Sequence, residues 1–252
     1  EIHHNHIYNI AMKREFCGFE IAGIKLHAAV DVQLHHNCIH HCRLGIWLDW
    51  QAQGARVSQS LFYANNRDLM VEATHGAYLA DNNIFASAFN FDNVAQGGAY
   101  LHNLCCGIMR RVGALDRSTP YHFAHTTAIA GSAAVYSGDD RLYQNIFLGG
   151  APQNVKNTCY GTEGYCGCPA SLEEYTEKVA ALGNGDLDLF MQVKQPAYIN
   201  GNAYLNGAQG YDREISAFCS SADPQVKIIA EENGTVWLEL TLPEELFHME
   251  TS

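Results

Sequence analysis

The sequence predicts an all-β solenoid, a fold in which short strands stack into a tube of repeated coils. Two observations predict it. A short pattern recurs with a period near 22 residues, and each period contains short β-branched or aliphatic runs broken by Gly, Asn and Asp rather than helical periodicity. Each coil of such a tube contacts only its neighbours and buries apolar side chains inward.

The repeat has an apolar residue, then Asn or Ser three positions later, then a second apolar residue after two more. Leu101 lies 22 residues beyond Leu79, the first residue of the third closely spaced copy, and the expected Asn follows one place early, at Asn103. Copies starting at Ile2, Leu142 and Ile199 are more widely spaced, which predicts inserted loops. We expect the recurrent Asn to face inward at a corner and to bond the coils above and below. The three closely spaced copies are Leu34/Asn37/Ile39, Val57/Ser60/Phe62 and Leu79/Asn82/Ile84, with first positions 57 − 34 = 23 and 79 − 57 = 22 residues apart.

The predicted domain boundaries follow from the spacing of these repeats. Residues 1–206 should form the coils, with loops inserted at 108–140 and 150–197. The second insertion should carry one short helix, because Ser171-Leu-Glu-Glu174 is a capping box that precedes apolar residues at helical spacing. Residues 207–252 should form a separate β element, with a hairpin turn at Asn233-Gly234.

Composition excludes several classes of partner. The chain of 252 residues has 15 Lys plus Arg and 27 Asp plus Glu, a net charge of −12, which disfavours nucleic acid and anionic membranes. The nine Cys have no disulfide-framework spacing, which favours a reducing, cytoplasmic location. The chain opens without Met or a signal-type segment, so we expect a piece of a longer protein. An open end of the tube predicts contact with other chains, most simply a homo-oligomer.

One column of side chains carries the predicted chemistry. The segments 23–27, 45–49 and 68–72 align in the repeat, and side chains alternate along a strand. His27, Asp49 and Glu72 should therefore form one column on the outer wall of the tube, with neighbouring strands about 4.8 Å apart.

Two carboxylates so close repel each other. At about 5 Å and an effective dielectric near 20 the repulsion is about 3 kcal/mol, so one acid should hold its proton near neutral pH. Glycoside hydrolysis uses such a pair, and a separation of about 5 to 5.5 Å favours the retaining mechanism. Two solvated surface acids with a water or a cation between them are the structural alternative.

Several neighbouring side chains are candidates for binding a sugar. Indoles beside Asp49 can stack on a sugar ring, and residues of the long insertion could cap the pocket and restrict it to chain ends. Ordinary packing is the alternative for each of them. The candidate substrate-binding residues are Glu20, His27, Trp47, Trp50, His75, Tyr121, His122 and His125.

We expect neither a metal nor an organic cofactor. The runs His3-His4, His35-His36 and His40-His41 straddle predicted corners and lack companion Cys or carboxylates at zinc spacing, which favours corner packing. Cys166-Gly-Cys168 lacks the spacing of a redox or zinc site and is interpreted as a turn.

A family resemblance adds to this interpretation. The segments 45–54, 67–72 with Gly76, 96–100, 117–122 and 195–200 occur in order and resemble the β-xylosidases of glycoside hydrolase family 120. The resemblance implies a right-handed parallel β-helix with a β-sandwich element, and exo-acting hydrolysis of β-xylosides and short xylo-oligosaccharides with retention. It also implies that Asp49 is the nucleophile and Glu72 the acid/base. Family members are longer, so this chain would be a C-terminal part.

Two other functions stay open at the level of sequence. A solenoid polysaccharide lyase would need a calcium-binding acidic cluster and an Arg base, for which Arg43 and Arg67 lie near the wall. A non-catalytic carbohydrate-binding solenoid would need neither acid for turnover.

Overall fold

The computed structural model describes residues 1–13, 20–182 and 193–248. Most of the strands belong to three sheets, whose neighbouring strands are parallel except where β20 meets β15. The first sheet has seven strands, in the order β1 (Ile2–His3), β4 (Gln33–His35), β7 (Ala55–Ser58), β10 (Tyr78–Asp81), β13 (Gly98–Leu101), β18 (Asp140–Tyr143) and β21 (Ala197–Asn200).

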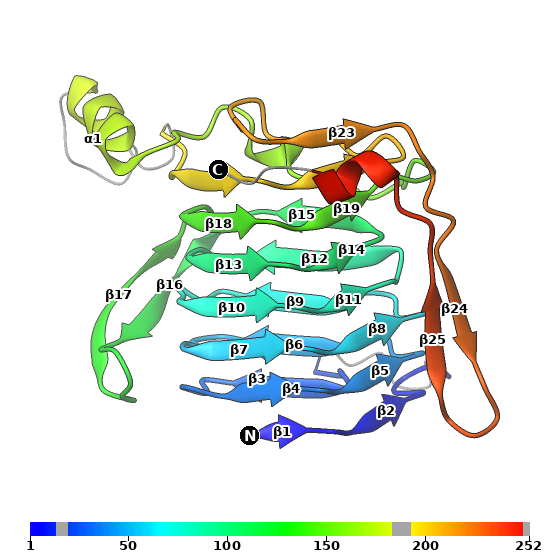
Figure 1. Cartoon of the computed structure of the whole chain (residues 1–252). Helices are drawn as coiled ribbons and strands as arrows, with labels where there is room; N and C mark the ends of the chain where they lie inside the picture. The colour runs from blue at the N-terminus through cyan, green and yellow to red at the C-terminus, as the bar shows by residue number, and fades with distance from the viewer. Residues whose placement is uncertain (14–19, 183–192, 249–252) are drawn as a thin grey trace.

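The second sheet has eight strands, in the order β2 (His6–Tyr8), β5 (Cys38–His40), β8 (Leu61–Tyr63), β11 (Ile84–Phe85), β14 (Leu104–Cys105), β19 (Ile146–Leu148), β22 (Ala203–Leu205) and β23 (Phe218–Ser220). The third sheet has six, in the order β20 (Thr158–Cys159), β15 (Ile108–Arg111), β12 (Phe89–Val94), β9 (Leu69–Glu72), β6 (Ile46–Asp49) and β3 (Ile24–His27). From β4 to β15 the chain visits the three sheets in turn, so successive repeats stack in sequence order (Figure 1).

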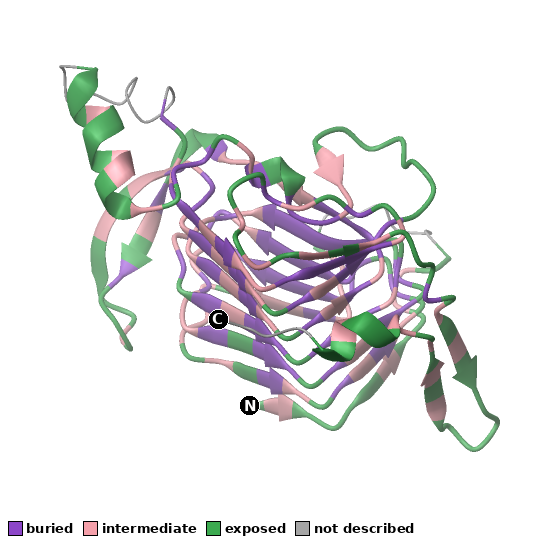
Figure 2. Ribbon diagram, turned by 45° about the horizontal axis from the view of Figure 1, so that its top comes forward, coloured by how far each residue is buried: buried purple, intermediate pink, exposed green. Residues whose placement is uncertain are grey.

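The core lies between the three sheets. Inward side chains of all three form one apolar cluster, which includes Leu34 from the first sheet, Phe62 from the second and Leu48 from the third, each at most 1% exposed. The buried segments follow the interior of the stack, while the hairpins and the helix outside it are largely exposed (Figure 2). Burial of alternate residues on short parallel strands is what the β-branched and aliphatic runs predict.

A ladder of amides runs through one corner of the stack, as predicted. Each member after the first accepts a hydrogen bond from the backbone N–H of the member before it, at 2.9 to 3.1 Å. From Asn37 onward the ladder is buried and satisfies polar groups that no water reaches. Its members are Asn5, Asn37, Ser60, Asn83, Asn103, Asn145 and Asn202.

The predicted register was wrong by one residue in the third closely spaced copy. Ala80, not Leu79, pairs with Val57 and with Tyr100, so the ladder residue is Asn83 and the second apolar residue is Phe85. Asn103 is therefore in register rather than one place early. The sequence pattern chose the large Leu79 over the small Ala80, whereas the fold buries the alanine completely and leaves Asn82 exposed.

The residue just before the ladder position turns the corner with a left-handed backbone. Most L-residues avoid this region, and Asn and His are among those enriched there. The residues concerned are His4, His36, Gln59, Asn82, His102 and Gln144, with φ between 48° and 55°.

The insertions are placed differently from the predicted ranges. Ile108–Arg111 and Asp140–Tyr143 are strands of the stack, so the first insertion is the antiparallel hairpin of β16 (Ala114–His122) and β17 (Ile129–Val135) with its flanks. The second insertion contributes β20 and the short 3₁₀ helix η1 (Glu163–Tyr165) before β21 begins at Ala197. Local pattern alone does not separate a short sheet strand from the loop that follows it.

The predicted helix and tail hairpin are both present. In α1 (Leu172–Ala181) the Ser171 hydroxyl accepts from the Glu174 N–H, and the Glu174 carboxylate accepts from Ala170 N–H. β24 (Lys227–Ala230) and β25 (Val236–Glu239) pair antiparallel, and η2 (Glu244–His248) follows. The stack continues past residue 206, because β23 pairs with β22. No helix in the described ranges is long and apolar enough to span a membrane.

Candidate active site

The predicted column forms on the outer face of the third sheet. His27 pairs with Asp49 in register, and Ile46–Leu48 pair with Leu69–Val71, which makes Glu72 the next neighbour of Asp49. Ile46, Leu48, Leu69 and Val71 lie in the core, so Asp49 and Glu72 both point outward. The sequence correctly predicted that these two acids are on adjacent strands of one wall.

Asp49 is held by a backbone donor and a cation. Its Oδ1 accepts a hydrogen bond of 2.7 Å from the Trp50 N–H, and its Oδ2 lies 2.8 Å from Lys25 Nζ. The residue is only 7% exposed, so the carboxylate is largely withdrawn from bulk water. A buried charge of this kind needs such partners, which also fix the direction of the carboxylate.

Lys25 connects three groups of the site. Its ammonium lies 3.8 Å from the centre of the Trp47 ring and forms ion pairs with both Asp49 and Glu20. Trp47 packs outward with Leu44 and Met70 in a small apolar cluster, which keeps the ammonium away from water on that side. Glu20 is exposed and reaches the site through Lys25.

The surroundings of Glu72 raise the pKa of its carboxyl. Burial raises its pKa above the usual value, and the charge of Asp49 raises it further, whereas the Arg117 guanidinium lowers it. Arg117 comes from β16, with Nη2 3.6 Å from Glu72 Oε1, and its guanidinium also lies over the Trp50 ring, 5.2 Å from the ring centre. Desolvation and a like charge favour the protonated carboxyl.

The β16–β17 hairpin is fastened to the wall by side chains of the stack. His75 Nε2 lies 2.9 Å from the Thr119 carbonyl and 3.1 Å from the Ala133 carbonyl, so the ring N–H contacts both hairpin strands. Gln53 pairs with both backbone groups of His122, its Oε1 accepting and its Nε2 donating at 3.1 Å. The hairpin thereby carries Arg117 to Glu72.

The predicted substrate-binding residues divide into two groups. Trp47, Trp50 and His27 lie around Asp49, with the His27 ring edge-on to Trp50 at 6.0 Å between centres. His75, His122 and His125 instead make contacts that position the hairpin, the last through Asp31 at 3.0 Å. Tyr121 is exposed and packs its ring against His75, 5.2 Å away.

Several buried donors near the wall have no hydrogen-bond partner among the residues that the structure describes. A buried polar atom without a partner is costly, and sugar hydroxyls would supply acceptors. These atoms are Nε1 of Trp47, Nε1 of Trp50 and Oγ1 of Thr119.

Two site residues were missed by the sequence prediction. Lys25 could have been predicted from the sequence, because it lies two residues before His27 on the same strand and therefore faces the same side of the sheet. Arg117 had none, because its approach to Glu72 depends on how a hairpin 45 residues further along the chain folds back (117 − 72 = 45).

A second ionic group lies one row further along the wall. Asp92, completely buried, pairs with Arg67 at 2.9 Å and with Arg110 at 2.6 Å. Arg67 is thus committed to an ion pair and is poorly suited to act as the base of a lyase. Among the described residues, the group able to offer three metal ligands consists of histidines and lies elsewhere.

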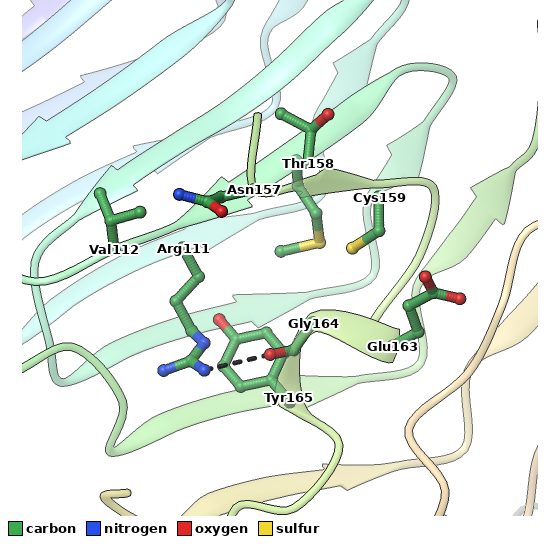
Figure 3. A pocket seen from close by; sticks show the side chains of 9 residues that line it. Arg111, Val112, Asn157, Thr158, Cys159, Glu163, Gly164 and Tyr165 are labelled. Carbon is green, nitrogen blue, oxygen red and sulfur yellow. Dashed lines mark hydrogen bonds between the residues drawn. The ribbon is translucent and has the colours of Figure 1, made fainter. Parts of the chain in front are cut away.

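A cavity of about 350 Å³ lies at the far end of the third sheet (Figure 3). Residues of β15, β20 and η1 line it, and Arg111 Nη2 donates to the Gly164 carbonyl at 3.0 Å. Its lining includes none of the predicted site residues.

No family model matches the sequence, and no curated protein matches it significantly. A solved structure, that of XylC in complex with xylose, is similar with 54% sequence identity and a TM-score of 0.92 over 98% of this chain. The chain belongs to glycoside hydrolase family 120. This family-120 chain spans 38% of the length of the XylC chain.

Proposed function

We propose that this chain carries the two catalytic carboxylates of a retaining, exo-acting β-xylosidase that hydrolyses β-xylosides and short xylo-oligosaccharides. The main support is that two carboxyl groups on adjacent strands have different surroundings. Asp49 lies beside the Lys25 cation, and Glu72 has a raised pKa. An ionised and a protonated carboxyl are the two groups that glycoside hydrolysis with retention requires. The xylose in the XylC complex supports a xyloside as the substrate.

The reaction would proceed in two displacements. Asp49 Oδ attacks the anomeric carbon while the bond to the leaving oxygen breaks, and Glu72 gives its proton to that oxygen. Glu72, now a carboxylate, takes a proton from water as that water attacks the anomeric carbon and displaces Asp49. Xylose leaves with its original configuration, and Glu72 is protonated again.

The proposal extends to the closed fold of this enzyme, its location in the cell and its self-association. The three sheets visited in turn would close into a right-handed parallel β-helix whose coils extend to β23, with the β24–β25 hairpin as the separate β element. The hairpin would restrict the pocket to chain ends. A cytoplasmic location is supported by the free thiols of the eight cysteines that the structure describes. Edge strands at the ends of the sheets would favour self-association.

Trapping of the intermediate tests the role of Asp49. The full-length protein is incubated with a slow, activated fluorinated xyloside and digested, and the labelled peptide is identified by mass spectrometry. We expect the sugar on Asp49, and a label on any other residue would refute the assignment. The Asp49→Asn variant serves as the matched control and should remain unlabelled.

The anomer released first distinguishes the mechanism from its alternatives. NMR during the first turnovers should show the β anomer of xylose, because two displacements restore configuration. The α anomer would exclude the retaining mechanism. Unsaturated products would indicate a lyase, and sugar binding without any turnover would indicate a binding module.

A further inference from the structure

Histidines cluster at the corner between the first and second sheets, near the first strand. Along this corner the His3 ring stacks on His35, with centres 4.9 Å apart and planes within 7°, and the His4 ring stacks on His36 at 4.8 Å and 5°. The sequence favoured corner packing for these residues, and the backbone does place them at a corner, with His4 and His36 in the left-handed region. The same placement assembles a set of donor nitrogens.

Three of these rings converge closely enough to share one ion. One nitrogen each of His4, His35 and His36 lies within 4.8 Å of the other two, and Nδ1 of His35 is 2.8 Å from Nδ1 of His36. A tetrahedral ion with bonds of about 2.0 to 2.1 Å holds its ligand nitrogens about 3.3 Å apart. His4 and His36 are exposed, so small ring rotations can reach this geometry without disturbing the core.

A carboxylate already orients one of the rings. Glu1 Oε1 lies 2.7 Å from His35 Nε2, so the Nε2–H bond is used and Nδ1 is left with its lone pair toward His36. Metal-binding histidines commonly donate their second N–H to a carboxylate in this way, which fixes the tautomer and the ring. This second feature distinguishes the corner from an ordinary exposed histidine pair.

We propose that His4, His35 and His36 bind one divalent transition-metal ion of the zinc, nickel and copper group, with water completing the coordination. Imidazole ligands suit these ions, while the absence of oxygen ligands from the trio disfavours calcium and magnesium. Binding would displace the proton shared by His35 and His36. The ion would tie the first two repeats together at a corner that contains neither Asp49 nor Glu72.

Zinc titration of the untagged full-length protein tests the site. We expect one equivalent of Zn²⁺ by isothermal titration calorimetry, and with Co²⁺ the visible absorption of a four-coordinate ion. The variants His4→Asn and His36→Asn should each weaken zinc binding at least about tenfold. Asparagine tolerates the left-handed backbone, so folding should be retained, which circular dichroism checks.

His102→Asn is the matched control. His102 has the same left-handed corner conformation, with φ 54°, but its Nε2 bonds Gln144 rather than another ring. Its replacement should leave zinc affinity unchanged. Failure to bind zinc, unchanged affinity in both His4→Asn and His36→Asn, or an equal loss in His102→Asn would overturn the proposal.

Discussion

At the scale of single residues, the site depends on how two like groups are given different surroundings. Asp49 receives a backbone N–H and an ammonium, while Glu72 is partly buried and faces the half-exposed guanidinium of Arg117 at 3.6 Å. The two acids therefore differ in environment although they occupy equivalent positions on neighbouring strands. This difference supports the roles of nucleophile and acid that we propose for Asp49 and Glu72, which strand spacing alone leaves unassigned.

Removal of the Arg117 charge should shift the alkaline limb of the pH profile. Glu72 must be protonated to act as an acid, so kcat/KM falls as pH rises through its pKa. Arg117 lowers that pKa, so Arg117→Gln should raise it and move the limb to higher pH, by a small shift because the pair is exposed to solvent screening. The measurement is kcat/KM against pH with an aryl xyloside.

Arg141→Gln is the control for this experiment. Arg141 pairs with Asp139 and contacts neither acid of the wall, so its removal should leave the limb in place. A shift to lower pH in Arg117→Gln, or an equal shift in both variants, would contradict the role assigned to Arg117.

At the scale of elements, the buried ladder fixes the register of the repeats. Asn103 illustrates its part: Oδ1 accepts from the backbone and side chain of Asn83, while Nδ2 donates to the Ala80 carbonyl and to Asn145 Oδ1. A shift of one residue would turn each inward side chain outward. The ladder therefore specifies the register that puts Asp49 beside Glu72.

Asn103→Ala should be strongly destabilising. It removes the acceptor of two buried Asn83 donors and the side-chain donor to the Ala80 carbonyl, which we expect to lower the free energy of unfolding by about 3 kcal/mol. Denaturant titration measures the change. Asn82→Gly is the control, because Asn82 is exposed with φ 55° and should cost less than about 0.5 kcal/mol. Equal losses in the two variants would contradict this register.

The sequence was sufficient for elements that local chemistry determines. The capping box predicted α1, Asn-Gly predicted the tail turn, and alternation placed Asp49 and Glu72 on one wall. The sequence prediction failed where the period was irregular. The repeat that follows Ala80 is 20 residues long rather than 22, and with that length Ala80 fits the core position as well as Leu79 does. The pairing of Arg117 with Glu72 could not be predicted, because it depends on hairpin docking rather than on period.

At the scale of the whole molecule, the hairpin and the stack form one functional unit. The stack supplies both acids, and the hairpin supplies the cation that faces Glu72. The attachment is polar through Gln53, His75 and the backbone of the hairpin, and apolar where Ala114 and Val135 pack against Ala73. Figure 1 shows that β16 and β17 lie alongside the stack rather than within it.

Loss of His75 should loosen this attachment. His75→Ala removes the contacts to the Thr119 and Ala133 carbonyls, so hydrogen exchange in residues 114–135 should become faster, and kcat/KM should fall about tenfold as Arg117 loses its position. Exchange mass spectrometry and kinetics measure the two effects. His41→Asn, at an exposed corner, is the control. A loss of activity with unchanged exchange would instead indicate that His75 contacts the sugar.

The bulge in β12 has a consequence for how this wall can vary. Asn90 is an extra residue between Phe89 and Phe91. Its side-chain amide donates to the Asp68 carboxylate and the Ser87 carbonyl and accepts from the Gly107 N–H. The bulged strand β12 neighbours β9, which carries Glu72, on the side opposite β6, which carries Asp49. The pairing between β6 and β9 is uninterrupted. A change in chain length can thus be absorbed on the β12 side of the acids, while the segment 50–68, which contains β7 and β8, must keep its length for both carboxyls to face the same sugar.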